Sequence, residues 1–184
     1  MAKKSSAPLP EAPIPVLSNN LIRRCLDAGW IAIQPFDEKY LAPSAYRLRS
    51  YKVRYHRRDE DSLLDSGSIL LSARAYALQP KENVVVSIEE QITLREGLVA
   101  DFYAASGCIE QGLVLTAGRL EPHYEHAIVL GLFNASDEEI ILSPDLQIAR
   151  VTFGWLGAQN LPSYQGGGPG DYIKGVGKLR DPKK

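Results

Sequence analysis

The stretch "LVLTAGRLEPHYEHAIVLGLFN", residues 113–134, decides which kind of fold this chain can adopt. Two short apolar runs, 113–117 and 127–133, stand on either side of a turn that is rich in glycine, proline and charge. Apolar runs bounded by turn residues in this way are typical of β-strands. Gly131 interrupts the second run, and a glycine inside a strand usually marks a bulge or the close approach of a ligand or another backbone.

Similar short runs recur on both sides of this stretch and predict a mainly β domain. The expected strands are 31–33, 45–55, 68–71, 75–78, 83–89, 91–94, 97–104, 113–117, 127–133, 139–142 and 147–153. One short amphipathic helix is expected near the start, with Ser18 and Asn19 as candidate caps and Gly29 as its stop. So many short strands with so little helix indicate a barrel or jelly-roll-like fold.

The ends of the chain differ in composition from its middle. Residues 1–16 contain four prolines and are expected to form a disordered arm. Residues 17–160 carry the predicted β domain, and residues 161–184 form a glycine-rich tail with a basic end. Within the domain, the charged block 56–67 is interpreted as a solvated loop between two strands.

Charge and cysteine usage limit the classes of partner. The formal net charge is −1, so no general attraction to nucleic acid or to an anionic membrane is implied. The two cysteines, Cys25 and Cys108, fit free thiols in a reducing cytoplasm. The N-terminal segment has no apolar core, which predicts neither a signal peptide nor a membrane span. We therefore expect a cytoplasmic protein without membrane or nucleic-acid partners.

Familiar catalytic motifs do not occur in this sequence. The H-x-E and P-C-x-x-C arrangement of zinc deaminases is absent, as are a Walker loop and a G-x-S-x-G elbow. His123 and His126, three residues apart at the entrance to a strand, would not share a face. No zinc and no other metal bound directly by protein side chains is therefore expected.

Several stretches in sequence order together resemble the dCTP deaminase and dUTPase superfamily. Residues 17–50 are similar to the deaminase opening, a short helix followed by G-x-I-x-I-x-P-F and a P-S-S-Y-D-L-R-L-type strand. Residues 106–134 are similar to its serine loop, I-D-x-x-Y-x-G turn and strand ending in Asn. Residues 142–153 resemble L-x-x-G-x-x-I-x-Q-L-x-F, and "YQGGGPG" at 164–170 resembles the segment that closes the deaminase site.

The resemblance implies a distorted jelly-roll β-barrel with a short N-terminal helix, assembled as a homotrimer with sites at the subunit interfaces. It also implies a pyrimidine deoxynucleotide ligand, whose triphosphate lies at the serine loop beneath a C-terminal lid. Deaminase members use a glutamate on the strand after the turn and no zinc. Triphosphatase members use the turn aspartate, with Mg²⁺ on the phosphates.

Four expected site positions have lost the residue type of the family pattern. The deaminase glutamate of V-L-E-F-Y-N falls on Gly131, and without a carboxyl group that position cannot move a proton. The phosphate-binding arginines of the serine loop fall on Ala105 and near Glu110, and an acid repels a triphosphate. The aspartate of S-Y-D-L-R is Arg47.

Other positions keep the family residue or carry a close replacement. The residues that match nucleotide-binding positions are Ser106, Gly107, Tyr124, Tyr164, Gln165 and Arg49. Ser106 could equally cap a short helical turn, and Tyr124 could stack on a sugar or pack at the trimer seam. Glu121 replaces the turn aspartate with one more methylene, which gives either a displaced catalytic base or a turn carboxylate that accepts backbone hydrogen bonds.

Two interpretations of function follow. The favoured one is a homotrimeric dCTP deaminase-like protein with lost or strongly altered activity, acting as a nucleotide-binding or scaffold protein. An active paralogue or another protein is a candidate partner in that case. The alternative is a divergent active dCTP deaminase or dUTPase that uses Glu121 with Ser106 and the glycine-rich tail, and Mg²⁺ on its triphosphate substrate.

Overall fold

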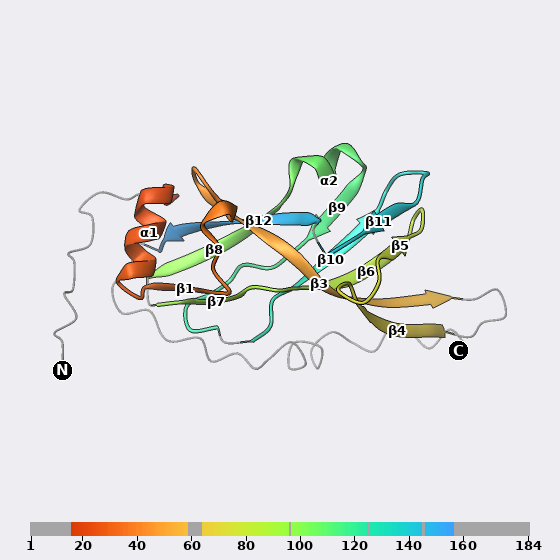
Figure 1. Cartoon of the computed structure of the whole chain (residues 1–184), viewed down its shortest axis with the longest axis horizontal. Helices are drawn as coiled ribbons and strands as arrows, with labels where there is room; N and C mark the ends of the chain where they lie inside the picture. The colour runs from red at the N-terminus through yellow and green to blue at the C-terminus, as the bar shows by residue number, and fades with distance from the viewer. Residues whose placement is uncertain (1–15, 59–63, 96, 125, 145, 157–184) are drawn as a thin grey trace.

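The computed structural model describes residues 16–58, 64–95, 97–124, 126–144 and 146–156 (Figure 1). These residues form a mainly β domain with few helical turns, as the sequence predicts. The strands are β1 (Ile31–Gln34), β2 (Leu41–Ala42), β3 (Ala45–Arg58), β4 (Leu64–Leu70), β5 (Tyr76–Leu78), β6 (Asn83–Ile88), β7 (Gln91–Leu94), β8 (Leu98–Ala104), β9 (Leu113–Thr116), β10 (Val129–Asn134), β11 (Ile140–Leu142) and β12 (Gln147–Trp155). The helical elements are α1 (Asn19–Asp27), the 3-10 turn η1 (Glu38–Tyr40) and α2 (Ser106–Glu110).

One large sheet forms most of the barrel wall. Its eight strands include a path in the order β8-β12-β3-β6-β10-β9, and β2 and β4 also pair with β3. The separate antiparallel pairs β1–β7 and β5–β11 complete the wall. Figure 1 shows that β8, β12 and β3 lie side by side, with α1 next to the end of β12. The fold class is therefore the distorted jelly-roll type that was expected.

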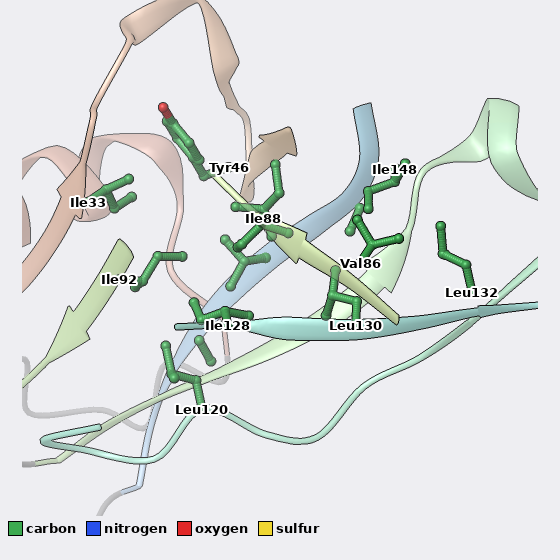
Figure 2. Packing of buried hydrophobic residues seen from close by; sticks show 14 of the residues in the cluster. Ile33, Tyr46, Val86, Ile88, Ile92, Leu120, Ile128, Leu130, Leu132 and Ile148 are labelled. Atoms are coloured by element: carbon green, nitrogen blue, oxygen red, sulfur yellow. The ribbon is translucent and has the colours of Figure 1, made fainter. Parts of the chain in front are cut away.

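Alternation along the strands builds the core. In β10 the inward positions are Leu130, Leu132 and Asn134, and in β6 they are Val84, Val86 and Ile88. Figure 2 shows Val86, Leu130 and Leu132 packing with residues of neighbouring strands. Each such buried aliphatic side chain contributes about 1.5–3 kcal/mol relative to an exposed one. The core therefore fixes which face of each strand turns outward.

Helix α1 begins and ends where the sequence predicts. The Ser18 hydroxyl accepts a hydrogen bond from the Leu21 amide, which satisfies one amide at the open N-terminal end of the helix. Ile22 and Cys25 face the core. Gly29 follows the helix with a φ of +67°, a left-handed conformation that favours glycine. The helix therefore lies against the barrel by one narrow apolar face.

The charged block 56–67 was predicted to be a loop, and this prediction is wrong for most of its length. β3 continues to Arg58 and β4 starts at Leu64, with Arg58 and Leu64 paired opposite each other. A two-stranded ribbon satisfies backbone groups by its own ladder, so polar side chains do not prevent strands there. The short elements η1 and β2 were not expected from the sequence.

Several expectations concern residues outside the described ranges. The proline-rich arm lies outside them apart from residue 16, and the tail 161–184 lies outside them completely. Among the described residues, no helix has the length and apolar character needed to span a membrane. Cys25 and Cys108 are both buried free thiols, as predicted.

Candidate functional site

Gly131 lies in the middle of β10 on the face that points away from the core. It pairs with Thr116 of β9 on one side and with Val85 of β6 on the other. A Cβ atom built on Gly131 would lie 2.2 Å from Thr116 Oγ1. The close neighbour of this glycine is therefore a threonine hydroxyl of the adjacent strand, which occupies the space where a side chain would begin.

The serine loop forms the start of α2. Ala105 is the N-cap residue of α2 and makes no side-chain capping hydrogen bond. Ser106 is the first helical residue, so the predicted capping role of Ser106 is wrong. Its hydroxyl instead accepts a hydrogen bond from Arg150 Nη2 at 3.2 Å. Because an exposed hydroxyl that accepts one bond keeps its own proton, Ser106 can still donate to a ligand.

Gly107 and Glu110 complete this short helix. Gly107 is exposed, and a Cβ atom there would meet nothing within 4 Å. Glu110 is the last residue of α2 and is exposed. Neither the Ala105 nor the Glu110 side chain can supply the positive charge that the family pattern places in this loop.

Arg150 is a candidate site residue that the sequence analysis missed. It lies on β12 opposite Arg47 of β3 on one side and opposite Tyr103 of β8 on the other. Arg150 stands at the glutamine position of the I-x-Q-L-x-F pattern, and Arg47 at an aspartate position. An arginine at each of these two pattern positions could have indicated a basic site from the sequence. Only the strand register shows that Arg47 and Arg150 are neighbours.

Arg49 is held inside the chain by two glutamates. Arg49 Nε lies 2.8 Å from Glu90 Oε1 and Nη1 lies 3.0 Å from Glu89 Oε2. Glu90 is buried and also accepts the Arg49 backbone amide at 3.1 Å. Burial alone lowers the pKa of Arg49, but the hydrogen bond and charge of Glu90, then Glu89, raise that pKa overall. The Arg49 guanidinium also lies 4.9 Å from the Tyr40 ring centroid.

Glu121 lies at the opposite end of β9 from the serine loop. Among the residues that the structure describes, no donor hydrogen-bonds to its carboxylate, and both interpretations of Glu121 stay predictions. Its neighbour Leu120 pairs with Ala100 of β8, whereas Ser106 follows Ala104 at the end of the same strand. Four strand residues span about 13 Å. One chain therefore does not bring Glu121 and Ser106 together.

The remaining candidate residues divide into two groups. Tyr124 is partly buried against the core, with its ring in edge contact with His126 at 5.3 Å. Tyr164 and Gln165 lie outside the described residues. The described chain thus gathers Ser106, Arg47 and Arg150 in one place and leaves Gly131 and Glu121 elsewhere.

Comparison with known proteins agrees with this fold. The family model for dCTP deaminase-like proteins matches residues 16–155, which is more than half of the chain. The chain therefore belongs to the dCTP deaminase-like family, within the dCTP deaminase and dUTPase superfamily.

Individual relatives are distant in sequence. The chain is 28% identical to a dCTP deaminase of Thermococcus kodakarensis over 123 residues, covering 67% of this chain and 75% of the relative. It is 27% identical to a dUMP-forming dCTP deaminase of Corynebacterium kroppenstedtii over 172 residues, covering 87% and 92%. The crystal structure of the deaminase from Agrobacterium tumefaciens superposes with a TM-score of 0.62 at 13% identity, covering 77% of this chain and 48% of that chain. This structural likeness concerns the fold alone.

Proposed function

We propose that this chain forms a homotrimer that binds a pyrimidine deoxynucleotide without deaminating it. One observation carries this proposal: the strand position of the deaminase glutamate is Gly131, and its side-chain space holds the Thr116 hydroxyl. Removing a general acid or base typically lowers a rate about 10²–10⁴-fold. Membership of the dCTP deaminase-like family supports the nucleotide class.

The alternative activity through Glu121 needs a contribution from a second subunit. Within one chain, Glu121 and Ser106 stand at different ends of β8 and β9. A trimeric interface could join them, as the resemblance implies, and an active paralogue could supply missing groups in the same way. A scaffold role for protein partners is compatible with the same interface. We favour binding without turnover because the serine loop lacks its arginines at 105 and 110.

Metal ions would enter this proposed site with the nucleotide. Among the described residues, no group of three or more His, Cys, Asp or Glu side chains could hold a metal ion. The chemistry of a triphosphate supplies oxygen ligands that Mg²⁺ prefers. The resemblance implies no zinc, and we propose Mg²⁺ only as a companion of a bound triphosphate.

The test uses the purified full chain with dCTP or dUTP and Mg²⁺. Base and phosphate products are followed by chromatography, and ligand binding by the melting temperature. At a ligand concentration a hundred times Kd, binding stabilises by about 2.7 kcal/mol, which corresponds to a rise of about 5–10 °C. We expect that rise with dCTP or dUTP and no product from either.

Two results would contradict the proposal. Turnover that disappears in Glu121→Gln would establish the alternative enzyme. If neither nucleotide at millimolar concentration changed the melting temperature, the chain would not bind these nucleotides. Glu138→Gln serves as the matched control, because Glu138 is an exposed glutamate near the end of β10.

A further inference from the structure

Two arginines face each other on the outer surface of the large sheet. Arg47 of β3 and Arg150 of β12 are directly opposite in an antiparallel pair, so their side chains share one face. Their neighbours Leu48 and Ala149 are buried in the core. Because side chains alternate along a strand, both arginines point away from the core, and both are half-exposed.

The acidic groups near this pair are already engaged. Arg49 lies two residues from Arg47 on the same face and forms ion pairs with both Glu89 and Glu90. Asp101, near Arg150 on β8, accepts two hydrogen bonds from Arg119, at 2.8 and 2.9 Å. Neither Arg47 nor Arg150 makes an ion pair with any residue that the structure describes.

Two cross-strand positions beside the arginine pair carry uncharged residues. Tyr103 of β8 lies opposite Arg150 of β12, and Gln147 of β12 lies opposite Arg49 of β3. Like charges directly opposite each other on a sheet destabilise the protein. The two arginines are nevertheless opposite each other. Among the described residues, no acidic side chain pairs with them and no core packing explains their presence. An anionic ligand would convert the repulsion into binding energy.

The serine loop supplies a third donor. Arg150 Nη2 lies 3.2 Å from Ser106 Oγ, which ties the arginine pair to the start of α2. Arg47, Arg150 and the Ser106 hydroxyl together present two forked cations and one O–H group on an exposed surface. Guanidinium groups match phosphate oxygens by two parallel hydrogen bonds, so the arrangement suits a phosphate chain better than a single carboxylate.

We propose that Arg47, Arg150 and Ser106 bind the phosphate groups of a nucleoside di- or triphosphate. This inference rests on the proposed function and names the groups that replace the loop arginines missing at 105 and 110. The positive charge has moved from α2 to the adjacent strands β3 and β12. Inorganic polyphosphate shares the same chemistry and serves as the probe for the phosphate contacts alone.

The experiment measures binding of tripolyphosphate and of dCTP by calorimetry to the wild-type chain and three variants. Arg47→Gln and Arg150→Gln each remove one guanidinium. Arg54→Gln, on β3 and exposed, is the matched control with the same change of charge. We expect each of the first two variants to bind both ligands about 10- to 100-fold more weakly, and the control to bind within about twofold of the wild type.

A second measurement separates binding from a structural role. Because removal of one arginine relieves repulsion in the ligand-free protein, Arg47→Gln is expected to melt at or above the wild-type temperature without ligand. A clear fall in that temperature would assign Arg47 to stability and overturn the inference.

The outcomes distinguish this inference from the proposed function. If dCTP binds equally to wild type, Arg47→Gln and Arg150→Gln, the phosphate site lies elsewhere while nucleotide binding stands. If tripolyphosphate binding depends on both arginines but dCTP binds no more tightly than tripolyphosphate, the phosphate site stands and the nucleotide function fails. Absence of binding by both ligands overturns both.

Discussion

Residue 131 shows how a single position can depend on its neighbour. The strand would gain from a residue other than glycine, since glycine in a strand interior costs about 0.5–1 kcal/mol relative to alanine. The Thr116 hydroxyl stands 2.2 Å from the position of the missing Cβ atom. Any side chain at 131 therefore requires the threonine to leave its rotamer, and the two positions are coupled.

The coupling can be measured with a double-mutant cycle. Gly131→Ala is expected to lower the free energy of unfolding by about 1 kcal/mol, because overpacking forces side chains off their rotamers. In a Thr116→Ala background the same substitution is expected to be neutral or stabilising, so the interaction energy is about 1–2 kcal/mol. Urea denaturation of the four proteins measures it. If the free-energy changes of the two substitutions were additive, the Thr116 hydroxyl would not be what excludes a side chain at position 131.

The buried thiols give a prediction with a pH dependence. Burial raises the pKa of the Cys108 thiol, and burial outweighs the charge of Arg24 to raise that of Cys25. A raised thiol pKa in the folded state means that ionisation favours the unfolded chain. The stability contributed by both thiols is therefore present at neutral pH and is lost as pH rises above the ordinary value of about 9.

Alkylation rates check this expectation. At pH 8, iodoacetamide should modify the native protein at least about tenfold more slowly than the urea-unfolded chain, because only exposed thiolate reacts. The difference should narrow as pH rises. Fast modification of the native protein at pH 8 would show that one of the thiols is accessible.

At the scale of elements, the end of β10 is fixed by a buried amide. Asn134 Nδ2 donates to the backbone carbonyls of Leu78 at 3.0 Å and Glu138 at 2.8 Å. Its Oδ1 accepts from the Ser136 amide at 3.0 Å and hydroxyl at 2.7 Å. One side chain thus joins β10 to β5 and to the turn before β11. The Asn134 side chain therefore fixes the end of β10 in this chain.

Replacement of Asn134 should loosen this corner of the barrel. Asn134→Asp keeps the shape but sets a carboxylate against two carbonyl oxygens, and we expect a loss of about 3 kcal/mol or more, since buried unsatisfied groups each cost about 1–3 kcal/mol. Ser136→Ala, which removes only hydroxyl contacts, should cost about 1 kcal/mol. Denaturation midpoints in urea compare the two. Equal midpoints for Asn134→Asp and wild type would contradict the structural role.

The elements also show what the sequence can and cannot predict. Alternation and turn residues predicted the core strands, because Val84, Val86 and Ile88 reveal a period of two. They failed at Arg58 and Leu64, where strand pairing continues through polar residues. The site was harder, since Arg150 and Arg47 are about a hundred residues apart in sequence and meet only through the register of β12 on β3. Register depends on the whole core and not on local pattern.

At the scale of the whole molecule, the expected assembly is a homotrimer. The face of β9 and β10 that turns away from the core carries Val114, which is 47% exposed, opposite Phe133. Contiguous apolar residues on an outward sheet face make a candidate subunit interface. We propose that it contributes to the homotrimer, which would have three times the 20.3 kDa mass of the chain.

Sedimentation equilibrium tests the assembly and the surface together. The wild type should sediment as a trimer, and Val114→Asp should shift the equilibrium toward monomer, because a buried unpaired carboxylate opposes association. Ile141→Asp, at an equally exposed apolar residue on β11, is the control that should remain trimeric. A monomeric wild type would contradict the trimer, and a trimeric Val114→Asp would place its interface elsewhere.

The backbone bond from the Leu17 amide to the Phe153 carbonyl, 2.8 Å long, joins the two ends of the domain. Chain entry and chain exit therefore lie side by side next to α1, as Figure 1 shows for the end of β12. A domain with adjacent ends tolerates insertion into a loop of another protein, and it also tolerates circular permutation. We therefore expect the domain to fold when it is inserted into another protein, with both connections made on the side of the barrel next to α1.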